Sequence, residues 1–259
     1  MNPSTEQTVA ADAAAFEVIS PWREGWRVFC SNKAAMVGLV LLTSLALMMV
    51  LGPSLYGVDA MDIAAAPFSA PFLDTLVWLG TDYLGRDVLA GILVGGRATV
   101  LVGLSAAAVA VTIGITVGAL AGFFGGWVDT ALSRLTELFQ VLPALLFAMV
   151  LVTLFTPSLQ VVIFAIGLVA WTGTARLARA EFMRLRGMEF ASAARAMGAG
   201  PLRLMLREIL PNALPPLIVS ASLIVGSAIL FEAGLSFLGL SDPNVMSWGL
   251  MIGDRKSVV

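Results

Sequence analysis

The chain alternates long uncharged stretches with shorter segments that carry its charged residues. A helix that crosses the hydrocarbon core of a bilayer needs roughly 20 predominantly apolar residues. The uncharged stretches that reach this length cover residues 34–55, 98–128, 138–175 and 212–231. The third stretch is too long for one crossing, and Pro157, between Thr156 and Ser158, favours a break near its middle. The pattern therefore predicts five transmembrane helices.

The composition agrees with this pattern. Hydrophobic residues make up 59% of the 259 residues and charged residues only 12%, whereas a soluble domain has about 45–50% apolar and about 25% charged residues. With so few polar groups, lipid must replace water over much of the surface. We therefore expect an all-α integral membrane protein, a polytopic helical bundle. Its transmembrane domain is predicted over residues 34–253, between a cytoplasmic tail at 1–33 and a short tail at 254–259.

The end of this domain differs from the spans before it. Residues 233–253 contain Asp242, Pro243 and four glycines. Glycine and proline interrupt regular helix. We expect a re-entrant or surface-lying segment here, not a clean span.

The basic residues are distributed unevenly between the connections. Five spans divide the connections into two sets, and the set with the N-terminal tail and residues 176–211 holds 11 of the 15 Lys and Arg residues. Basic residues gather on the cytoplasmic side of a membrane protein. We therefore expect a multi-pass protein with a cytoplasmic N-terminus, and an acidic external connection at residues 56–97.

Two glutamates, Glu137 and Glu232, lie near the ends of predicted spans. Charged residues at membrane depth are candidates for function. Interfacial placement or a structural salt bridge is the simpler expectation for both.

The residue types that most enzyme chemistry requires are scarce. The chain has no histidine and one cysteine, Cys30, so we expect no metal site, and a serine–histidine protease is excluded. It lacks the phosphate-binding pattern GxxxxGK[ST] and any basic tract for nucleic acid. An ion-driven secondary transporter or a non-transporting membrane scaffold stays open as an alternative to a transport pore.

Four glycines recur every fourth residue within and just after the second predicted span: Gly114, Gly118, Gly122 and Gly126. Small residues at this spacing form a groove that another helix can approach closely. The partner helix could belong to this chain or to another subunit, and the spacing alone favours packing within the chain.

The connection 176–211 predicts two short helices around a glycine hinge. Phe190, Ala194 and Met197 fall at i, i+4 and i+7, the spacing of one helical face. Gly198 and Gly200 then interrupt the helix. The helices could lie on the membrane surface with their arginines at lipid phosphates, or they could dock a cytoplasmic partner.

The second of these helices is predicted to run from Pro201 to Pro211. Proline suits the first helical position, and the residue before a proline avoids the helical region. The apolar stripe of this helix consists of Leu202, Met205, Leu206 and Ile209.

The same connection resembles the coupling loop of ABC importer permeases. That signature is Glu-Ala-Ala, three residues, Gly, and a Leu-Pro pair further on. In residues 189–198 (EFASAARAMG), Ser192 stands where the family has Glu, and Glu208 stands where it usually has an apolar residue. The positions that carry the resemblance are Ser192, Ala193, Ala194, Gly198, Leu210 and Pro211.

Further motifs are similar to those of dipeptide and oligopeptide permeases in the same order. They are residues 79–87 (LGTDYLGRD), 126–129 (GWVD), 140–143 (QVLP), 232–240 (EAGLSFLGL) and 247–249 (SWG). Within the first of them, Arg86 and Asp87 could order the external connection or contact a binding protein.

The resemblance implies an ATP-driven importer in a bacterial cytoplasmic membrane. This chain would form half of a pore for dipeptides or short oligopeptides, with a related permease as a heterodimeric partner. Two ATP-binding subunits, which use ATP and Mg, would dock at the coupling loop, and an external or periplasmic peptide-binding protein would deliver the solute. Small side chains at Ala193 and Ala194 would let this helix approach the ATP-binding subunits closely, and Gly198 would permit a sharp turn. The family fold has a sixth span after the Trp-Gly motif. From the resemblance we expect that the given sequence lacks this last transmembrane helix.

Overall fold

The computed structural model describes residues 21–72 and 77–254. The chain divides into two units, residues 1–51 and 52–259, which are described separately. The predictions for residues 1–20 and for the tail after Asp254 lie outside the described residues. Among the described residues, all regular structure is helical, which confirms the predicted class.

The first unit contains helix α2 (Pro21–Ser31) and most of helix α3 (Lys33–Tyr56). α3 begins after Asn32, whose side-chain oxygen accepts hydrogen bonds from the backbone N–H groups of Ala34 and Ala35 at 3.0 and 3.3 Å and so satisfies two donors that the helix leaves free. α3 confirms the first predicted span. α2 is a helix inside the segment predicted as a tail. Its basic residues Arg23 and Arg27 are four residues apart and so lie on one face of the helix.

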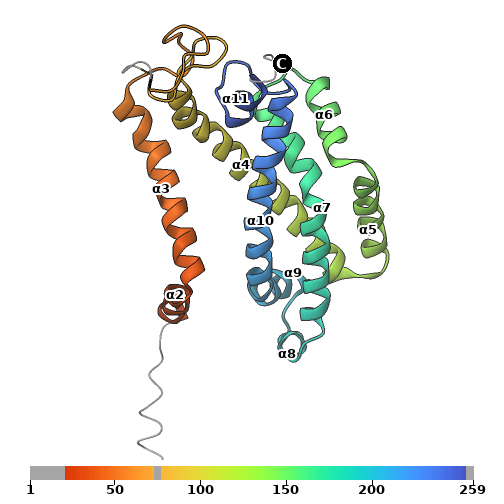
Figure 1. The fold of residues 1–259 in the computed structure, drawn as a ribbon. Helices are drawn as coiled ribbons and strands as arrows, with labels where there is room; N and C mark the ends of the chain where they lie inside the picture. Colours follow the sequence, from red (N-terminus) through yellow and green to blue (C-terminus); the bar gives the residue numbers. More distant parts are fainter. Residues whose placement is uncertain (1–20, 73–76, 255–259) are drawn as a thin grey trace, which may run out of the picture. The chain divides into compact units, whose positions relative to one another are not determined.

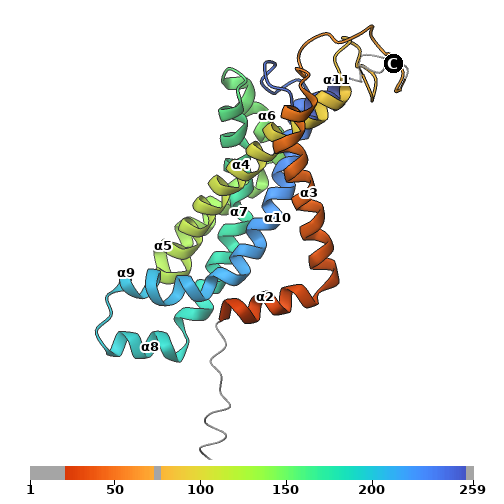
Figure 2. The same ribbon diagram turned by 90° about the vertical axis from the view of Figure 1, so that its left-hand side faces the viewer.

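The second unit is a helical bundle in which α4 (Val88–Phe124), α7 (Leu159–Arg186) and α10 (Leu210–Phe237) lie side by side (Figure 1). Helices α5 (Gly126–Val141) and α6 (Ala144–Leu154) run along the outside of α7. The short helices α8 (Glu189–Ala196) and α9 (Pro201–Arg203) lie at one end, which we call the α8 end, and α11 (Trp248–Asp254) lies at the other (Figure 2).

Four helices in the described residues are long and apolar enough to cross a membrane, or five if α5 and α6 together count as one span. The five predicted spans match if this bent pair is one span, and their boundaries move, most clearly for α4 and α7. α4 begins ten residues before the predicted start at 98 and includes Arg97, because Asp87 caps it. α7 continues eleven residues past the predicted end at 175 and carries four of the arginines that were placed in a loop.

The third span is not one straight helix. α5 and α6 are bent by 87° at a short break. Leu142 takes an extended backbone conformation directly before Pro143, as expected for the residue that precedes a proline. The break predicted at residues 156–158 is confirmed, because α6 ends at Leu154 and the Ser158 side chain caps α7.

The prediction that Pro211 ends a helix is wrong. α9, a π-helical segment (Leu204–Ile209) and α10 form one continuous helix from Pro201 to Phe237. Proline lacks an N–H group and its ring clashes with the preceding turn of an α-helix, and the wider π turn lies directly before Pro211. The Asn212 side chain donates to the Glu208 carbonyl at 2.6 Å, which gives that oxygen a partner.

Residues 238–254 fold back onto the bundle. α10 ends where Gly239, with φ of 76°, lets the chain reverse. α11 then packs closely on α10, since a Cβ at Gly249 would lie 2.6 Å from the Ser236 Cβ. α11 continues to Asp254, the last described residue, and the re-entrant or surface-lying placement of this segment stays a prediction.

Candidate functional site: the α8 connection and the adjoining pocket

Helix α8 ends in a tight reversal at Gly198. The Gly198 N–H donates to the Arg195 carbonyl at 2.9 Å and the Ala199 N–H donates to the Ala194 carbonyl at 3.0 Å, which is the hydrogen-bond pattern of a Schellman motif. Gly198 has φ of 84°, a conformation that glycine adopts without steric cost. The sharp turn predicted at Gly198 is therefore present.

One face of α8 belongs to the hydrophobic core of the bundle. Ala191 and Ala194 are buried with Phe182 and Leu185 of α7, and the same cluster includes Ile209 at the start of the continuous final helix. The prediction that Ala193 and Ala194 together form a docking surface is corrected here. Ala194 is only 6% exposed and faces this chain's own core, so it is not available to a partner.

The opposite face of α8 is open to solvent. The exposed residues of α8 and of its C-terminal end are Glu189, Ser192, Ala193, Arg195, Ala196 and Met197. Met197 is 83% exposed at the tip of the connection. α8 is thus a short helix fixed by one face to the bundle, with small side chains, the charged Glu189 and Arg195, and the apolar Met197 on its exposed side.

The apolar stripe predicted after Pro201 is only partly correct. Met205 and Ile209 are buried as expected, but Leu202 and Leu206 are exposed and Leu204 takes their place in the core. A π-helix has more residues per turn than an α-helix, so the face toward the core shifts. Of the Leu-Pro pair, Leu210 packs on the core and Pro211 is exposed.

The glycines of α4 face α7 of the same chain. A Cβ at Gly114 would lie 2.6 Å from the Thr174 Cβ, and a Cβ at Gly118 would lie 2.3 Å from the Ala175 carbonyl oxygen. At Gly122 it would lie 2.4 Å from the Arg179 carbonyl oxygen. These three glycines let the two helices approach closely, so the groove is filled within the chain.

Gly126 is not part of this groove. It lies beyond the end of α4, has φ of 53°, and a Cβ there would meet no atom within 4 Å. The prediction for this fourth glycine is wrong because α4 ends at Phe124. Gly126 instead helps the backbone turn into α5.

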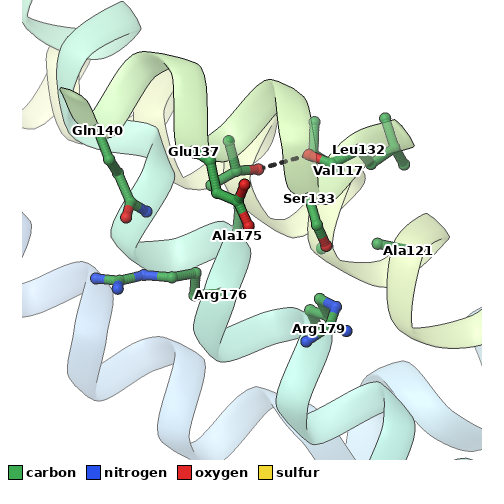
Figure 3. Close-up of a pocket in the computed structure, with 11 residues that line it drawn as sticks. Val117, Ala121, Leu132, Ser133, Glu137, Gln140, Ala175, Arg176 and Arg179 are labelled. Atoms are coloured by element: carbon green, nitrogen blue, oxygen red, sulfur yellow. Dashed lines mark hydrogen bonds between the residues drawn. The ribbon is translucent and has the colours of Figure 1, made fainter. Parts of the chain in front are cut away.

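A pocket of about 130 Å³ lies beside this seam, between α4, α5 and α7 (Figure 3). Its apolar wall consists of small residues such as Gly118, Ala121 and Ala175. Its polar wall consists of Ser133, Thr136, Glu137, Gln140, Arg176 and Arg179. Figure 3 shows the α5 side chains opposite the arginines of α7. The sequence does not predict this pocket, because α5 and the C-terminal part of α7 lie in connections that are far apart along the chain.

The two glutamates near span ends have different surroundings. Glu137 is exposed and forms an ion pair with Arg134 of the same helix at 2.8 Å, as expected for a surface residue. Glu232 is 3% exposed and lies inside the bundle, and its interfacial placement stays a prediction. The Ser236 hydroxyl donates to one Glu232 oxygen at 2.6 Å and the Thr99 hydroxyl to the other at 3.4 Å.

The Glu232 cluster connects three segments of the bundle. Thr99 belongs to α4, and its hydroxyl also accepts a hydrogen bond from the backbone N–H of Trp248 at 3.2 Å. The Ser247 hydroxyl donates to that of Ser236 at 3.4 Å. This buried polar cluster therefore fixes the folded-back segment against α4 and α10.

Residues 79–87 order the connection between α3 and α4. The Asp87 carboxylate is 1% exposed, accepts from the N–H groups of Leu89 and Ala90, and accepts from the Tyr56 hydroxyl at 2.5 Å. Gly80 and Gly85 have positive φ, and carbonyl oxygens of residues 69 and 65 occupy the space where a Cβ would stand. Of the two roles considered for Asp87, the structure supports the ordering role.

The fold and this site define a polytopic membrane protein of the transport class: a bundle of apolar helices that carries a short, rigidly held helix at one end. Sequence comparison identifies the protein family. The family described as binding-protein-dependent transport system inner membrane component matches residues 114–255, and the N-terminal TM domain of oligopeptide transport permease C matches residues 20–72. The chain belongs to this family, and it is a multi-pass inner-membrane permease subunit of an ABC importer.

Curated relatives support the assignment over most of the chain. The dipeptide transport system permease protein DppC of Alkalihalophilus pseudofirmus is 36% identical, over 94% of this chain and 80% of its own length. The oligopeptide transport system permease protein OppC of Escherichia coli (strain K12) is 39% identical, over 91% of this chain and 78% of its own length.

The fold itself is similar to a solved transporter. A chain of the MetNI methionine ABC transporter in an inward-facing conformation matches with a TM-score of 0.53 and 18% identity. The match covers 65% of this chain and 81% of that chain. At this level of identity the likeness concerns the fold alone.

Proposed function

We propose that this chain forms one half of a pore for dipeptides or short oligopeptides and passes movement from ATP-binding subunits to that pore through α8. The observation that carries the proposal is the placement of α8. Its buried face is continuous with a core built from α4, α7 and α10, whereas its other face is exposed at the end of the bundle (Figure 2).

This placement suits mechanical coupling. Close-packed interiors transmit displacement because they cannot deform gradually. A partner that moves α8 would therefore move the ends of three membrane-spanning helices with it, and a rigid-body change of this kind can alternate the access of a pore between two sides. ATP and Mg would be bound by the partner subunits.

We place the α8 end in the cytoplasm, together with the N-terminus. The basic residues of α7, α8 and α9 gather at this end, and such residues favour the cytoplasmic side. The folded-back segment and the connection between α3 and α4 would then face the outside, where a peptide-binding protein could deliver the solute. A related permease would supply the other half of the pore.

The solute class rests on the relatives. Their names refer to dipeptide and oligopeptide transport, and the chain has comparable identity to both. Uptake of radiolabelled dipeptides and tetrapeptides into cells that carry the complete transporter tests this part. Accumulation of neither peptide, in cells where assembly is verified, would contradict a peptide substrate.

The docking role is tested by purification of the complex. We expect wild-type chain, expressed with a related permease and the two ATP-binding subunits, to retain those subunits in detergent. Ala193→Trp places a large side chain on the exposed face of α8 without touching the core. We expect retention to fall by at least about tenfold, which corresponds to roughly 1.4 kcal/mol of binding free energy.

Ala180→Trp on α7 is the matched control, because Ala180 is exposed near the same end but lies outside α8. It should retain the subunits as the wild type does. If Ala193→Trp also retains them and supports normal uptake, α8 is not the docking element. In that case the arginines of residues 176–211 are better explained by contact with lipid phosphates.

A further inference from the structure

Two arginines of α7 reach across to the corner where α4 turns into α5. The Arg179 guanidinium donates two hydrogen bonds to the Asp129 carboxylate of α5. Nη2 donates to Oδ2 at 2.8 Å, and Nε donates to Oδ1. Arg186, seven residues later and therefore on the same helical face, donates from Nη1 to the Phe123 carbonyl of α4 at 2.7 Å. The corner is thus held to α7 at two points.

The corner itself is built from two glycines. Gly125 and Gly126 have φ of 68° and 53°, conformations in which other residues are strained. No side chain caps the start of α5. The direction in which α5 leaves α4 is therefore not fixed by the backbone alone, and contacts from α7 must contribute to it.

α5 has little packing of its own. Of its sixteen residues, Thr136 is the buried one. Phe139 makes an edge contact with Trp171 of α7, with ring centroids 5.4 Å apart. Elements with few buried apolar contacts are the ones that separate from a bundle most readily, so the bidentate Asp129–Arg179 pair is a major tether of α5.

The same end of α7 is connected to α8. The Arg195 guanidinium of α8 donates to the Arg186 carbonyl at 2.8 Å. Phe182 and Leu185, which lie between the two arginines of α7, are in the core cluster with Ala191 and Ala194 of α8. A contiguous set of contacts therefore runs from α8 through the end of α7 to α5.

We infer that Asp129 and Arg179 are a positioning pair that makes α5, and with it the polar wall of the pocket in Figure 3, follow α7 when α8 is displaced. The inference rests on the proposed coupling function. A path of contacts alone does not establish coupling, so the test must distinguish this role from that of an ion pair that only stabilises the fold. Loss of a purely stabilising ion pair would lower the melting temperature, whereas loss of a positioning pair would lower the amount of solute moved for each ATP hydrolysed.

The test uses the assembled transporter in proteoliposomes, with uptake and ATP hydrolysis measured on the same sample. The variants are Arg179→Gln, Asp129→Asn and the exchanged pair Asp129→Arg with Arg179→Asp. Arg184→Gln is the matched control: Arg184 also belongs to α7 and forms an ion pair, but its partner Glu181 is on the same helix. Retention of the ATP-binding subunits and the melting temperature are recorded for each variant.

We expect each single change to lower the ratio of solute moved to ATP hydrolysed by roughly fivefold or more, the scale of a coupling free energy of about 1 kcal/mol. Assembly should be unchanged, Arg184→Gln should behave as the wild type, and the exchanged pair should recover most of the ratio. An unchanged ratio in Arg179→Gln and Asp129→Asn would overturn the inference. Failure of the exchanged pair to recover the ratio would also overturn it, since the residues would then act separately.

The control separates this inference from the proposed function. If wild type and Arg184→Gln do not assemble with the ATP-binding subunits at all, the proposed function fails. If they assemble and transport normally while the pair variants do the same, only the positioning role fails.

Discussion

Three glycines of α4 stand opposite α7 at positions where a methyl group would overlap atoms of that helix. In a membrane, helices associate mainly through close packing and not through exclusion of water, so such positions set the distance between the two central helices. Not every helical glycine of the chain lies at such a contact. Gly173 of α7, for example, has no atom within 4 Å of a built Cβ and has an ordinary helical backbone.

This difference predicts opposite outcomes for the same substitution. Gly118→Ala should destabilise the protein by about 1–3 kcal/mol, because an overpacked interface forces helices apart. Gly173→Ala should be neutral or stabilising by up to about 1 kcal/mol, because alanine favours helix. The midpoint of thermal inactivation in detergent measures both, and an equal midpoint for the two variants would contradict the packing role of Gly118.

At the scale of elements, α8 depends on how its last turn is closed. Ala194 and Arg195 supply the carbonyls of the closing hydrogen bonds, and Gly198 supplies the left-handed residue. Gly200, two residues later, has φ of −68° and ψ of 161°, an extended conformation that any residue adopts. The two glycines thus differ in conformation although both are exposed.

We therefore expect Gly198→Val to open the connection and Gly200→Val to leave it intact. A left-handed conformation costs a residue with a Cβ roughly 1–2 kcal/mol, and a β-branched side chain adds to this. Limited proteolysis between α8 and α9 should be faster in Gly198→Val, which should also retain less of the ATP-binding subunits. Equal cleavage of both variants would show that the reversal does not depend on glycine.

At the scale of the whole molecule, the orientation of the bundle decides which end meets the ATP-binding subunits. The chain has a single native cysteine, Cys30, so reporter thiols can be added after one replacement. Suitable exposed positions are Ser192 on α8 and Ala70 in the connection between α3 and α4.

In a Cys30→Ser background, we expect a membrane-impermeant thiol reagent to label Ala70→Cys in intact spheroplasts. Ser192→Cys should be labelled only after the membrane is permeabilised, because the basic α8 end should stay in the cytoplasm. The opposite pattern would invert the orientation, and uptake assays on both variants would verify that the labelled protein is functional.

Much of the fold followed from local pattern. The absence of charge over about 20 residues marks a span, since a charged side chain at the bilayer centre is costly. Pro157 and its neighbours located a break, and the motif around Gly198 located the reversal after α8. These features depend on residues close in sequence, so they can be read without knowing what lies beside them.

The errors arose where contacts between distant segments decide the outcome. The sequence could not show that Ala194 faces inward and Ala193 outward, because this depends on how α8 packs against Phe182 and Leu185 of α7. Nor could it show that Asp129 and Arg179, fifty residues apart, form one ion pair. Charge at Arg97 and at the end of α7 suggested loops, whereas α4 begins at the Asp87 cap and α7 continues to Arg186.

The sequence by itself therefore determined the class of protein, the location of the apolar spans and the position of the α8 connection, because hydrophobicity and turn chemistry act locally. Only the tertiary structure decided which faces are buried, that the α4 glycines pack against α7, and that α5 is tied to α7 beside a polar pocket. Those outcomes depend on which helices become neighbours, and a bilayer imposes the same hydrophobic requirement on every span without specifying its partner.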